Sequence, residues 1–318
     1  MTLNIDSILF PTDFSDVAEG AFAHAAHLAL RYHATIHVFN VVSPEDGDGS
    51  NPMDFLPVEP ASGADTNDTA VQHVEVQTAT QERGTVPVVY TQTDSTSPSE
   101  AIINYAQNQS VDLVVMGTHG RRGMDRLLSG SVSEEVVRGA PCPVFTVLAS
   151  EEENHVPAIS RVLAPVDLSD QSEMVLDHAA ALADAYAAPL DLLHVVEEAA
   201  YPSAYGLDPL TPDLPSVQDR AREALETLAA ELDLRTDPVN VHVMAGNAAR
   251  DIVEFADDHE TDLIVMATHG RSGLERFLIG SVAEKVVRRA PCPVFTLKSY
   301  GKSLLPSEDE DTASDAPE

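Results

Sequence analysis

Residues 116–148 read MGTHGRRGMDRLLSGSVSEEVVRGAPCPVFTVL, and residues 266–298 read MATHGRSGLERFLIGSVAEKVVRRAPCPVFTLK. At a fixed offset of 150 residues, 22 of these 33 positions are identical. Near the beginning of each half, ILFPTDFS at 8–15 matches VLAPVDLS at 162–169, at an offset of 154 residues. This period is far longer than the roughly 20–50 residues of solenoid repeats, so it indicates two duplicated domains.

Each half has the pattern of strands that alternate with helices. The near-continuous apolar run at 111–116 is typical of a strand that is buried on both faces. In the first half we expect strands at 7–10, 35–42, 86–92, 111–116 and 144–148, and helices at 15–32, 66–83, 98–109 and 131–138. Strands separated by helices of this length predict a parallel, doubly wound α/β sheet.

The domain boundaries follow from the same comparison. Residues 43–65 and 197–216 are expected to be long loops, and 217–232 a stronger helix than its counterpart at 66–83. We expect a first domain over 1–148, a charged linker over 149–158, a second domain over 159–299 and an acidic, disordered tail over 300–318.

Composition narrows the classes of function. The 318 residues include 52 Asp and Glu against 18 Lys and Arg, a formal net charge of −34. Binding to nucleic acid needs clustered Lys and Arg, so this balance excludes a general nucleic-acid binder and argues against an anionic membrane surface. The N-terminal residues have no signal-peptide pattern, and no stretch approaches the roughly 20 apolar residues of a membrane span. We therefore expect a cytoplasmic protein.

The lysine content is a second peculiarity of the composition. Lys285, Lys298 and Lys302 are the only lysines in the chain. Abundant carboxylates with few lysines resemble the proteins of salt-in halophiles, in which molar salt screens the repulsion between surface charges. An acidic protein from an ordinary cytoplasm is the alternative.

The glycine-serine loop after the strand at 111–116 is the most informative segment. Gly117-Thr118-His119-Gly120 is followed, after nine residues, by Gly130-Ser131 and a helix. Glycines let backbone N–H groups approach a ligand, and a helix N-terminus adds unpaired N–H groups and partial positive charge. Together they predict a phosphate-binding loop. An alternative stays open, because 131–134 and 281–284 also fit a capping box in which serine only caps the helix.

At these residues the sequence resembles the universal stress protein family, in a tandem two-domain form. The nucleotide-binding members carry Gly, two residues, Gly, nine residues, then Gly-Ser or Gly-Thr, and the first half matches this pattern fully. The resemblance implies two Rossmann-like domains of the adenine nucleotide alpha hydrolase-like type. Each would have a five-stranded parallel sheet of order 3-2-1-4-5 flanked by helices, with ATP and Mg²⁺ at the carboxyl end of the sheet.

The resemblance also assigns residues to the nucleotide. In the first half these are Pro11, Asp13 and Val41 on the adenine side, and Met116, Gly117, Gly120, Gly130, Ser131, Val132 and Ser133 around the ribose and phosphates. The matching residues of the second half are Pro165, Asp167, Val195, Met266, Gly270, Gly280, Ser281 and Val282. Arg121 and Arg271, which follow the second glycine of each loop, either pair with phosphate or are solvated or domain-interface residues.

The two halves depart from the family pattern at different places. The second half has Ala267 in place of the first glycine, and Ala283 where the first half has Ser133. It keeps Gly246-Asn247-Ala248 before its third helix, similar to the family's Gly-x-Pro, where the first half has Thr96-Ser97-Pro98. Each half therefore retains a feature that the other lacks.

Other candidate residues have structural alternatives. Asp13 and Asp167 either accept hydrogen bonds from the nucleotide or organise a turn. For His119 and His269 the simpler interpretation is a packing role, and the alternative is proton transfer. For Cys142 and Cys292 the simpler interpretation is a small buried hydrophobic residue, and the alternative is a reactive thiol. No motif of a metal site is present.

The function implied by the resemblance is that of an ATP-binding stress-response sensor or adaptor, not an enzyme, with an unidentified protein partner. A slow ATPase or phosphotransferase and a nucleotide-free interaction module are the alternatives. The family also implies that 144–148 and 294–298 pair, so that the two domains form a pseudo-dimer, and the full chain is a candidate for further dimerisation.

Overall fold

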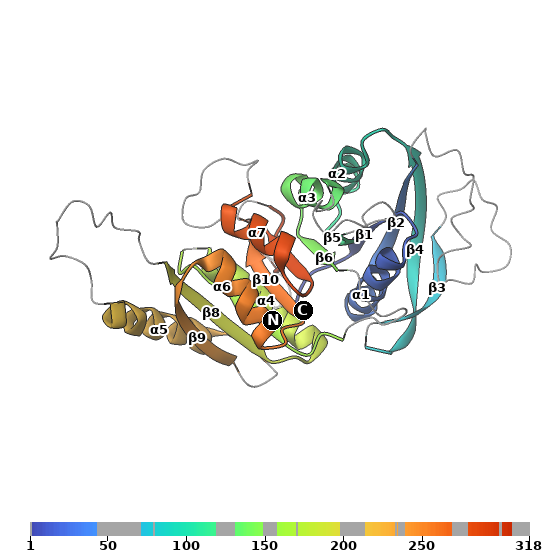
Figure 1. Ribbon diagram of the computed structural model, residues 1–318. Helices are drawn as coiled ribbons and strands as arrows, with labels where there is room; N and C mark the ends of the chain where they lie inside the picture. Colours follow the sequence, from blue (N-terminus) through green and yellow to red (C-terminus); the bar gives the residue numbers. More distant parts are fainter. Residues whose placement is uncertain are drawn as a thin grey trace, which may run out of the picture. The chain divides into compact units, whose positions relative to one another are not determined.

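The computed structural model describes residues 2–42, 71–78, 80–118, 131–148, 158–169, 171–197, 214–232, 234, 239–268, 279–298 and 301–306. The chain divides into two compact units. Unit 1 contains Met1–Ala158 and Pro293–Glu318, and unit 2 contains Ile159–Cys292. Figure 1 shows that each unit combines β-strands with α-helices, which confirms the predicted α/β class.

The sheet of unit 1 has its parallel strands in the order β4-β2-β1-β5-β6. Their bounds are β1 Ser7–Thr12, β2 Thr35–Val42, β4 Arg83–Asp94, β5 Leu113–Gly117 and β6 Val144–Val147. The helices of this unit are α1 Asp16–Tyr32, α2 Pro98–Asn108 and α3 Ser131–Gly139. Helix α1 begins after Ser15, whose side chain accepts a hydrogen bond from the N–H of Ala18, and ends at His33 in the left-handed conformation.

The helix expected over 66–83 is wrong for the part of that range that the structure describes. Strand β3, Gln72–Gln77, lies there instead and pairs antiparallel with β4. Val74 and Val76 are buried, whereas the residues between and beside them are exposed. This alternation has the period of two that a half-buried strand requires. The strand also makes the expected count of five strands too small for unit 1.

Unit 2 has four described strands, all parallel, in the order β10-β7-β8-β9. Their bounds are β7 Val162–Pro165, β8 Leu190–Glu197, β9 Val239–Gly246 and β10 Leu263–Ala267. The helices are α4 Ser172–Tyr186, α5 Leu214–Glu231, α6 Ala248–Asp258 and α7 Ser281–Arg289. Helix α5 begins three residues earlier than expected, and α4 to α7 alternate with the strands along the chain.

The last strand, β11 Val294–Leu297, belongs to unit 1 although the second half of the sequence encodes it. As expected, it pairs with β6, and the pairing is antiparallel with Phe295 opposite Phe145. The hydroxyl of Thr146 donates to the carbonyl oxygen of Val294 at 3.0 Å, and that of Thr296 to Val144 at 3.1 Å. The compact unit that contains the rest of the second half thus ends at Cys292, before β11.

The expectation of a disordered tail from residue 300 is wrong for residues 301–306. Leu304 is fully buried, and its carbonyl oxygen accepts a hydrogen bond from the N–H of Asn4 at 2.6 Å. The prediction of disorder was based on the acidic composition of the whole tail, which does not show that unit 1 buries Leu304. Residues 307–318, the linker at 149–157 and the loop at 43–65 lie outside the described residues. Within the described part, none of the helices combines the length and apolar character of a membrane span.

Candidate functional site

A cleft of about 690 Å³ opens at the carboxyl ends of β7, β8 and β10 in unit 2. Its walls also include the beginnings of α4, α6 and α7 and one face of α5. Ligands of parallel α/β sheets bind outside the carboxyl ends of the strands, and small-molecule sites have volumes of about 300–1,000 Å³. Both position and size therefore suit a small-molecule ligand.

The described residues that the sequence assigned to the second site all line this cleft. They are Pro165, Asp167, Val195, Met266, Gly280, Ser281 and Val282. The departures from the family pattern, Ala267 and Ala283, line it as well. Gly270, Arg271 and His269 lie outside the described residues. The tertiary structure thus brings residues from three strand ends and one helix to a single cavity.

Asp167 organises the turn that follows β7. Its Oδ1 accepts hydrogen bonds from the backbone N–H of Ser169 at 3.1 Å and from the hydroxyl of Ser169 at 2.6 Å. Leu168, between them, has a φ of 56°, a left-handed conformation that is strained for a residue with a Cβ. This loop lines the cleft, so the strain is stored at the candidate site.

The same turn follows β1 in unit 1. Oδ1 of Asp13 accepts hydrogen bonds from the N–H and hydroxyl of Ser15 at 3.1 and 2.6 Å, and Phe14 has a φ of 57°. The turn-forming role that the sequence left open for the two aspartates is therefore present in both halves.

Helix α7 presents its N-terminus to the cleft. Its N-cap is Gly280, with φ −62° and ψ 144°, and no side chain caps it. Ser281 is the first helical residue, one position too late for a capping box, so that interpretation is wrong for the second half. The N–H of Gly280 donates to the carbonyl oxygen of Thr268 at 2.7 Å, and the first intrahelical bond runs from Glu284 to Gly280.

The geometry at this helix start leaves donors at the cleft wall. The N–H groups of Ser281, Val282 and Ala283 belong to the first turn, where a helix offers no carbonyl acceptor of its own. The positive end of the helix dipole lies at the same place. Such an arrangement attracts anions, phosphate among them.

In unit 1 the matching described residues lie at the carboxyl ends of β1, β2 and β5 and at the beginning of α3: Pro11, Asp13, Val41, Met116, Gly117, Ser131, Val132 and Ser133. The buried hydroxyl of Ser133 donates to the carbonyl oxygen of Thr118 at 3.3 Å and so ties α3 to the end of β5. Ala283 replaces this hydroxyl in unit 2. Gly120, Arg121, Gly130 and His119 lie outside the described residues.

Gly246 allows a buried carboxylate to approach the end of β9. A Cβ at this position would lie 2.0 Å from Oδ2 of Asp251. That oxygen accepts a hydrogen bond from the N–H of Asn247 at 2.8 Å. The side-chain oxygen of Asn247 caps α6 by accepting a hydrogen bond from the backbone N–H of Arg250. The glycine and asparagine of this motif therefore fix the beginning of α6, whose first residue, Ala248, lines the cleft.

Several lining residues were not among the sequence assignments. Helix α5 contributes Val217, Arg220 and Ala221, and Gln171 and His194 lie on neighbouring elements. The sequence predicted α5 as a helix, but nothing in one sequence shows which face it turns to a cavity. Arg220 adds a cation to a wall that also includes two carboxylates, Asp167 and Glu197.

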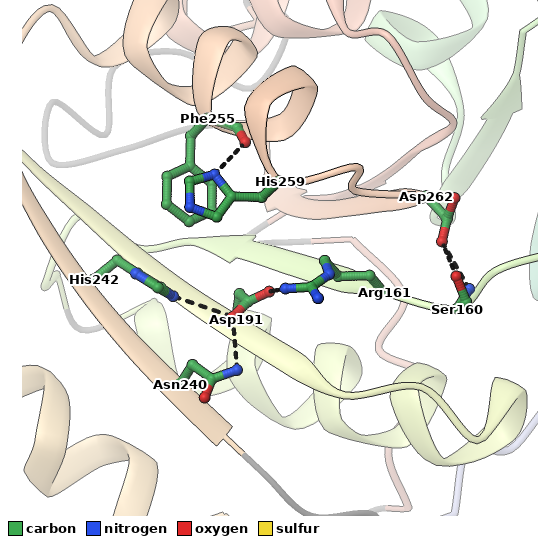
Figure 2. Close-up of polar contacts among 8 residues, drawn as sticks. All are labelled: Ser160, Arg161, Asp191, Asn240, His242, Phe255, His259 and Asp262. Carbon is green, nitrogen blue, oxygen red and sulfur yellow. Dashed lines mark hydrogen bonds and ion pairs between the residues drawn. The ribbon is translucent and has the colours of Figure 1, made fainter.

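A separate polar cluster lies at the amino ends of the unit 2 strands, away from the cleft (Figure 2). Asp191, 1% exposed, accepts hydrogen bonds from Arg161 at 3.2 Å, Asn240 at 2.9 Å and His242 at 3.1 Å. Beside it, His259 stacks on Phe255 with ring centroids 3.7 Å apart. The donors compensate the buried charge of Asp191, which is a structural role.

The two cysteines are buried, and burial raises the pKa of each thiol to about 12. A thiol with this pKa is not ionised at neutral pH, so the reactive interpretation is wrong for both. Within the described residues, no group of three or more His, Cys, Asp or Glu side chains is arranged to hold a metal ion.

Comparisons with known proteins agree with this architecture. The chain is 33% identical over 160 residues to a universal stress protein of Methanocaldococcus jannaschii, covering 50% of this chain and 93% of that protein. It is 34% identical over 140 residues to a universal stress protein A homolog of Coxiella burnetii, covering 43% of this chain and 94% of that protein. Each relative thus corresponds to about one half of this chain.

A solved putative universal stress protein from Pseudomonas aeruginosa has a TM-score of 0.64 and 20% identity, covering 92% of this chain and 93% of that one. A universal stress protein from Archaeoglobus fulgidus has a TM-score of 0.55 and 18% identity, and the match covers 93% of this chain and 97% of that one. At these identities the likeness shows a shared fold. The sequence profile of the universal stress protein family matches residues 4–147 and again 158–298. The chain therefore belongs to the universal stress protein family and contains two copies of its domain in tandem.

Proposed function

We propose that this protein binds ATP in the cleft of unit 2 and at the matching strand ends of unit 1. The observation that carries the proposal is the convergence of all described, sequence-assigned residues of the second half on one cavity. Ser281 and Val282 supply backbone N–H groups for the phosphates, Val195 supplies apolar surface for the base, and Met266 lies on the ribose side.

The residues present suit such a ligand in their chemistry. Phosphate is anionic and would be held at the N-terminus of α7, while Asp167, on another wall, offers a carboxylate for hydroxyl or amino donors of the nucleoside. Mg²⁺ would accompany the triphosphate, which supplies its own oxygen ligands. No step of hydrolysis is assigned to a residue of the cleft.

The proposed role is that of a nucleotide-dependent sensor or adaptor and not of an enzyme. Binding would change the surface offered to a protein partner, so that ATP shifts the population of one conformation. The acidic, lysine-poor composition supports a halophilic cytoplasm as the setting, because molar salt screens a net charge of −34.

Isothermal titration of ATP and Mg²⁺ into the full chain, in multimolar KCl, tests the proposal. Gly130→Asp and Gly280→Asp each place a carboxylate at one proposed phosphate position, so each variant is expected to lose one site. Gly20→Asp is the matched control, because a Cβ there meets no atom within 4 Å. Absence of saturable binding to a folded chain would overturn the proposal.

A further inference from the structure

The side chain of Gln171 has a buried oxygen next to the unit 2 cleft. The residue immediately precedes Ser172, the first residue of α4, and lines the cavity. Its Oε1 is buried and, among the residues that the structure describes, has no hydrogen-bond partner. A buried acceptor without a donor is unfavourable, so native proteins satisfy nearly all of them.

Capping of α4 does not account for this side chain. Gln171 is the N-cap residue, but its side chain makes no capping hydrogen bond. In unit 1, by contrast, the N-cap Ser15 accepts a hydrogen bond from the N–H of Ala18. The matching Ser169 donates its hydroxyl to Asp167, as Ser15 does to Asp13, but it is not the N-cap of α4. Capping therefore leaves the Gln171 oxygen unsatisfied, and a rotation of the side chain would present this buried oxygen to a group in the cleft that the residue lines.

The chemistry of the cleft determines which end of a nucleotide would lie here. An amide oxygen accepts hydrogen bonds and repels a phosphate oxygen, as does the nearby carboxylate of Asp167. The N–H groups at the beginning of α7 have the opposite preference. Phosphates therefore belong at α7, and the donor-bearing base belongs at Gln171.

We propose that Gln171 is a specificity-determining residue of this cleft: its Oε1 accepts a hydrogen bond from the exocyclic amino group of adenine. This rests on the proposed nucleotide binding. Glutamine is a good partner for adenine because its amide offers an acceptor and a donor to one edge of the base. At the offset of 154 residues the first half has Val17, so this contact is specific to unit 2.

The test compares ATP with purine riboside triphosphate, which lacks the exocyclic amino group. Both are titrated into the full chain carrying Gly130→Asp, so that unit 2 supplies the signal. With Gln171 present, ATP is expected to bind about tenfold more tightly than the analogue, because a site built for a donor discriminates against its loss. Gln171→Met, similar in size but without the acceptor, is expected to bring the ratio close to one.

Two further variants keep the result interpretable. Gln171→Glu retains an acceptor oxygen and is expected to keep the preference for ATP. Gln107→Met, on the exposed face of α2, makes the same substitution away from the cleft and is expected to leave the ratio unchanged. Circular dichroism checks that each variant is folded.

The outcomes separate the two proposals. ATP binding with a ratio that Gln171→Met does not alter would overturn the assignment of Gln171 and leave nucleotide binding intact. No binding of either triphosphate by the folded chain would overturn nucleotide binding itself, and the assignment with it.

Discussion

Lys302 forms an ion pair with Asp112, so the segment after β11 is tied to the residue that precedes β5. The same carboxylate accepts hydrogen bonds from the backbone N–H groups of Asp6 and Ser7 at 2.9 and 2.8 Å. The Lys302 ammonium also donates to the carbonyl oxygen of Ser110 at 3.0 Å. Lys302, one of the three lysines of the chain, therefore links the segment after β11 through Asp112 to the residues at the beginning of β1, all within unit 1.

This contact predicts acid sensitivity. Burial alone would raise the pKa of Asp112, but hydrogen bonds from Lys302, Ser7 and Asp6 lower it below its ordinary value of 3.8. A lowered folded-state pKa contributes stability that is present above the unfolded pKa and lost as the pH falls through the folded pKa. We expect Asp112→Asn to destabilise the protein by about 1–3 kcal/mol at neutral pH and to flatten the loss of stability on acidification. Urea unfolding at a series of pH values measures both effects.

Asp262 is the matched control for this prediction. It occupies the equivalent place in unit 2, where it accepts hydrogen bonds from the N–H and hydroxyl of Ser160 at 2.9 and 2.6 Å (Figure 2). Lys302→Met should reproduce part of the effect of Asp112→Asn. If the loss of unfolding free energy at acidic pH is the same in Lys302→Met as in the unmodified protein, the ion pair does not contribute to it.

Gly246→Ala is expected to destabilise unit 2 by about 1–3 kcal/mol, because the added Cβ would lie 2.0 Å from the buried carboxylate of Asp251. Chemical denaturation measures the loss. Gly20→Ala is the control: its Cβ meets nothing within 4 Å, and alanine within a helix is favoured over glycine by up to about 1 kcal/mol. Equal effects of the two substitutions would count against the steric argument.

Asp191→Leu removes the acceptor at the centre of the cluster in Figure 2 and leaves three donors, on Arg161, Asn240 and His242, without it. The side chains of Arg161 and His242 are 38% and 31% exposed, so water can partly solvate them, and we expect a loss of about 1–3 kcal/mol in the free energy of unfolding. Glu197→Gln, at the exposed carboxyl end of the same strand, should change stability by about 0.5 kcal/mol or less. A small effect of Asp191→Leu would show that the donors find other partners.

Ser281→Pro tests one backbone donor of α7, the N–H of residue 281. Proline is well accepted at the first helical position, and Gly280, with φ −62° and ψ 144°, already has the conformation that a following proline requires. The helix should therefore persist with one N–H removed, and ATP should bind about five- to tenfold more weakly. Ser281→Ala keeps the N–H and should bind normally. Calorimetry with ATP and with adenosine separates a phosphate effect from a general one, since adenosine should be insensitive.

Much of the site could be predicted because its residues lie at fixed places in a repeated motif. Pro165 ends strand β7, Asp167 follows it and Gly280 immediately precedes α7, and parallel strands bring their carboxyl ends to one edge. The error at Gln72–Gln77 arose where apolar residues were few, and only the burial of Val74 and Val76 made the period of two clear. The capping box failed in the second half because the spacing of serine and glutamate alone does not show which residue begins the helix.

The duplication, the α/β class and the position of the glycine-serine loops could be read from the sequence, because they depend on local periodicity and on motifs within short segments. The folded structure was needed to show that β11 joins unit 1, that Lys302 meets Asp112, and that the oxygen of Gln171 is buried beside the cleft without a partner among the described residues. These properties depend on contacts between distant segments and on the solvent that folding excludes, and no single segment of the chain contains that information.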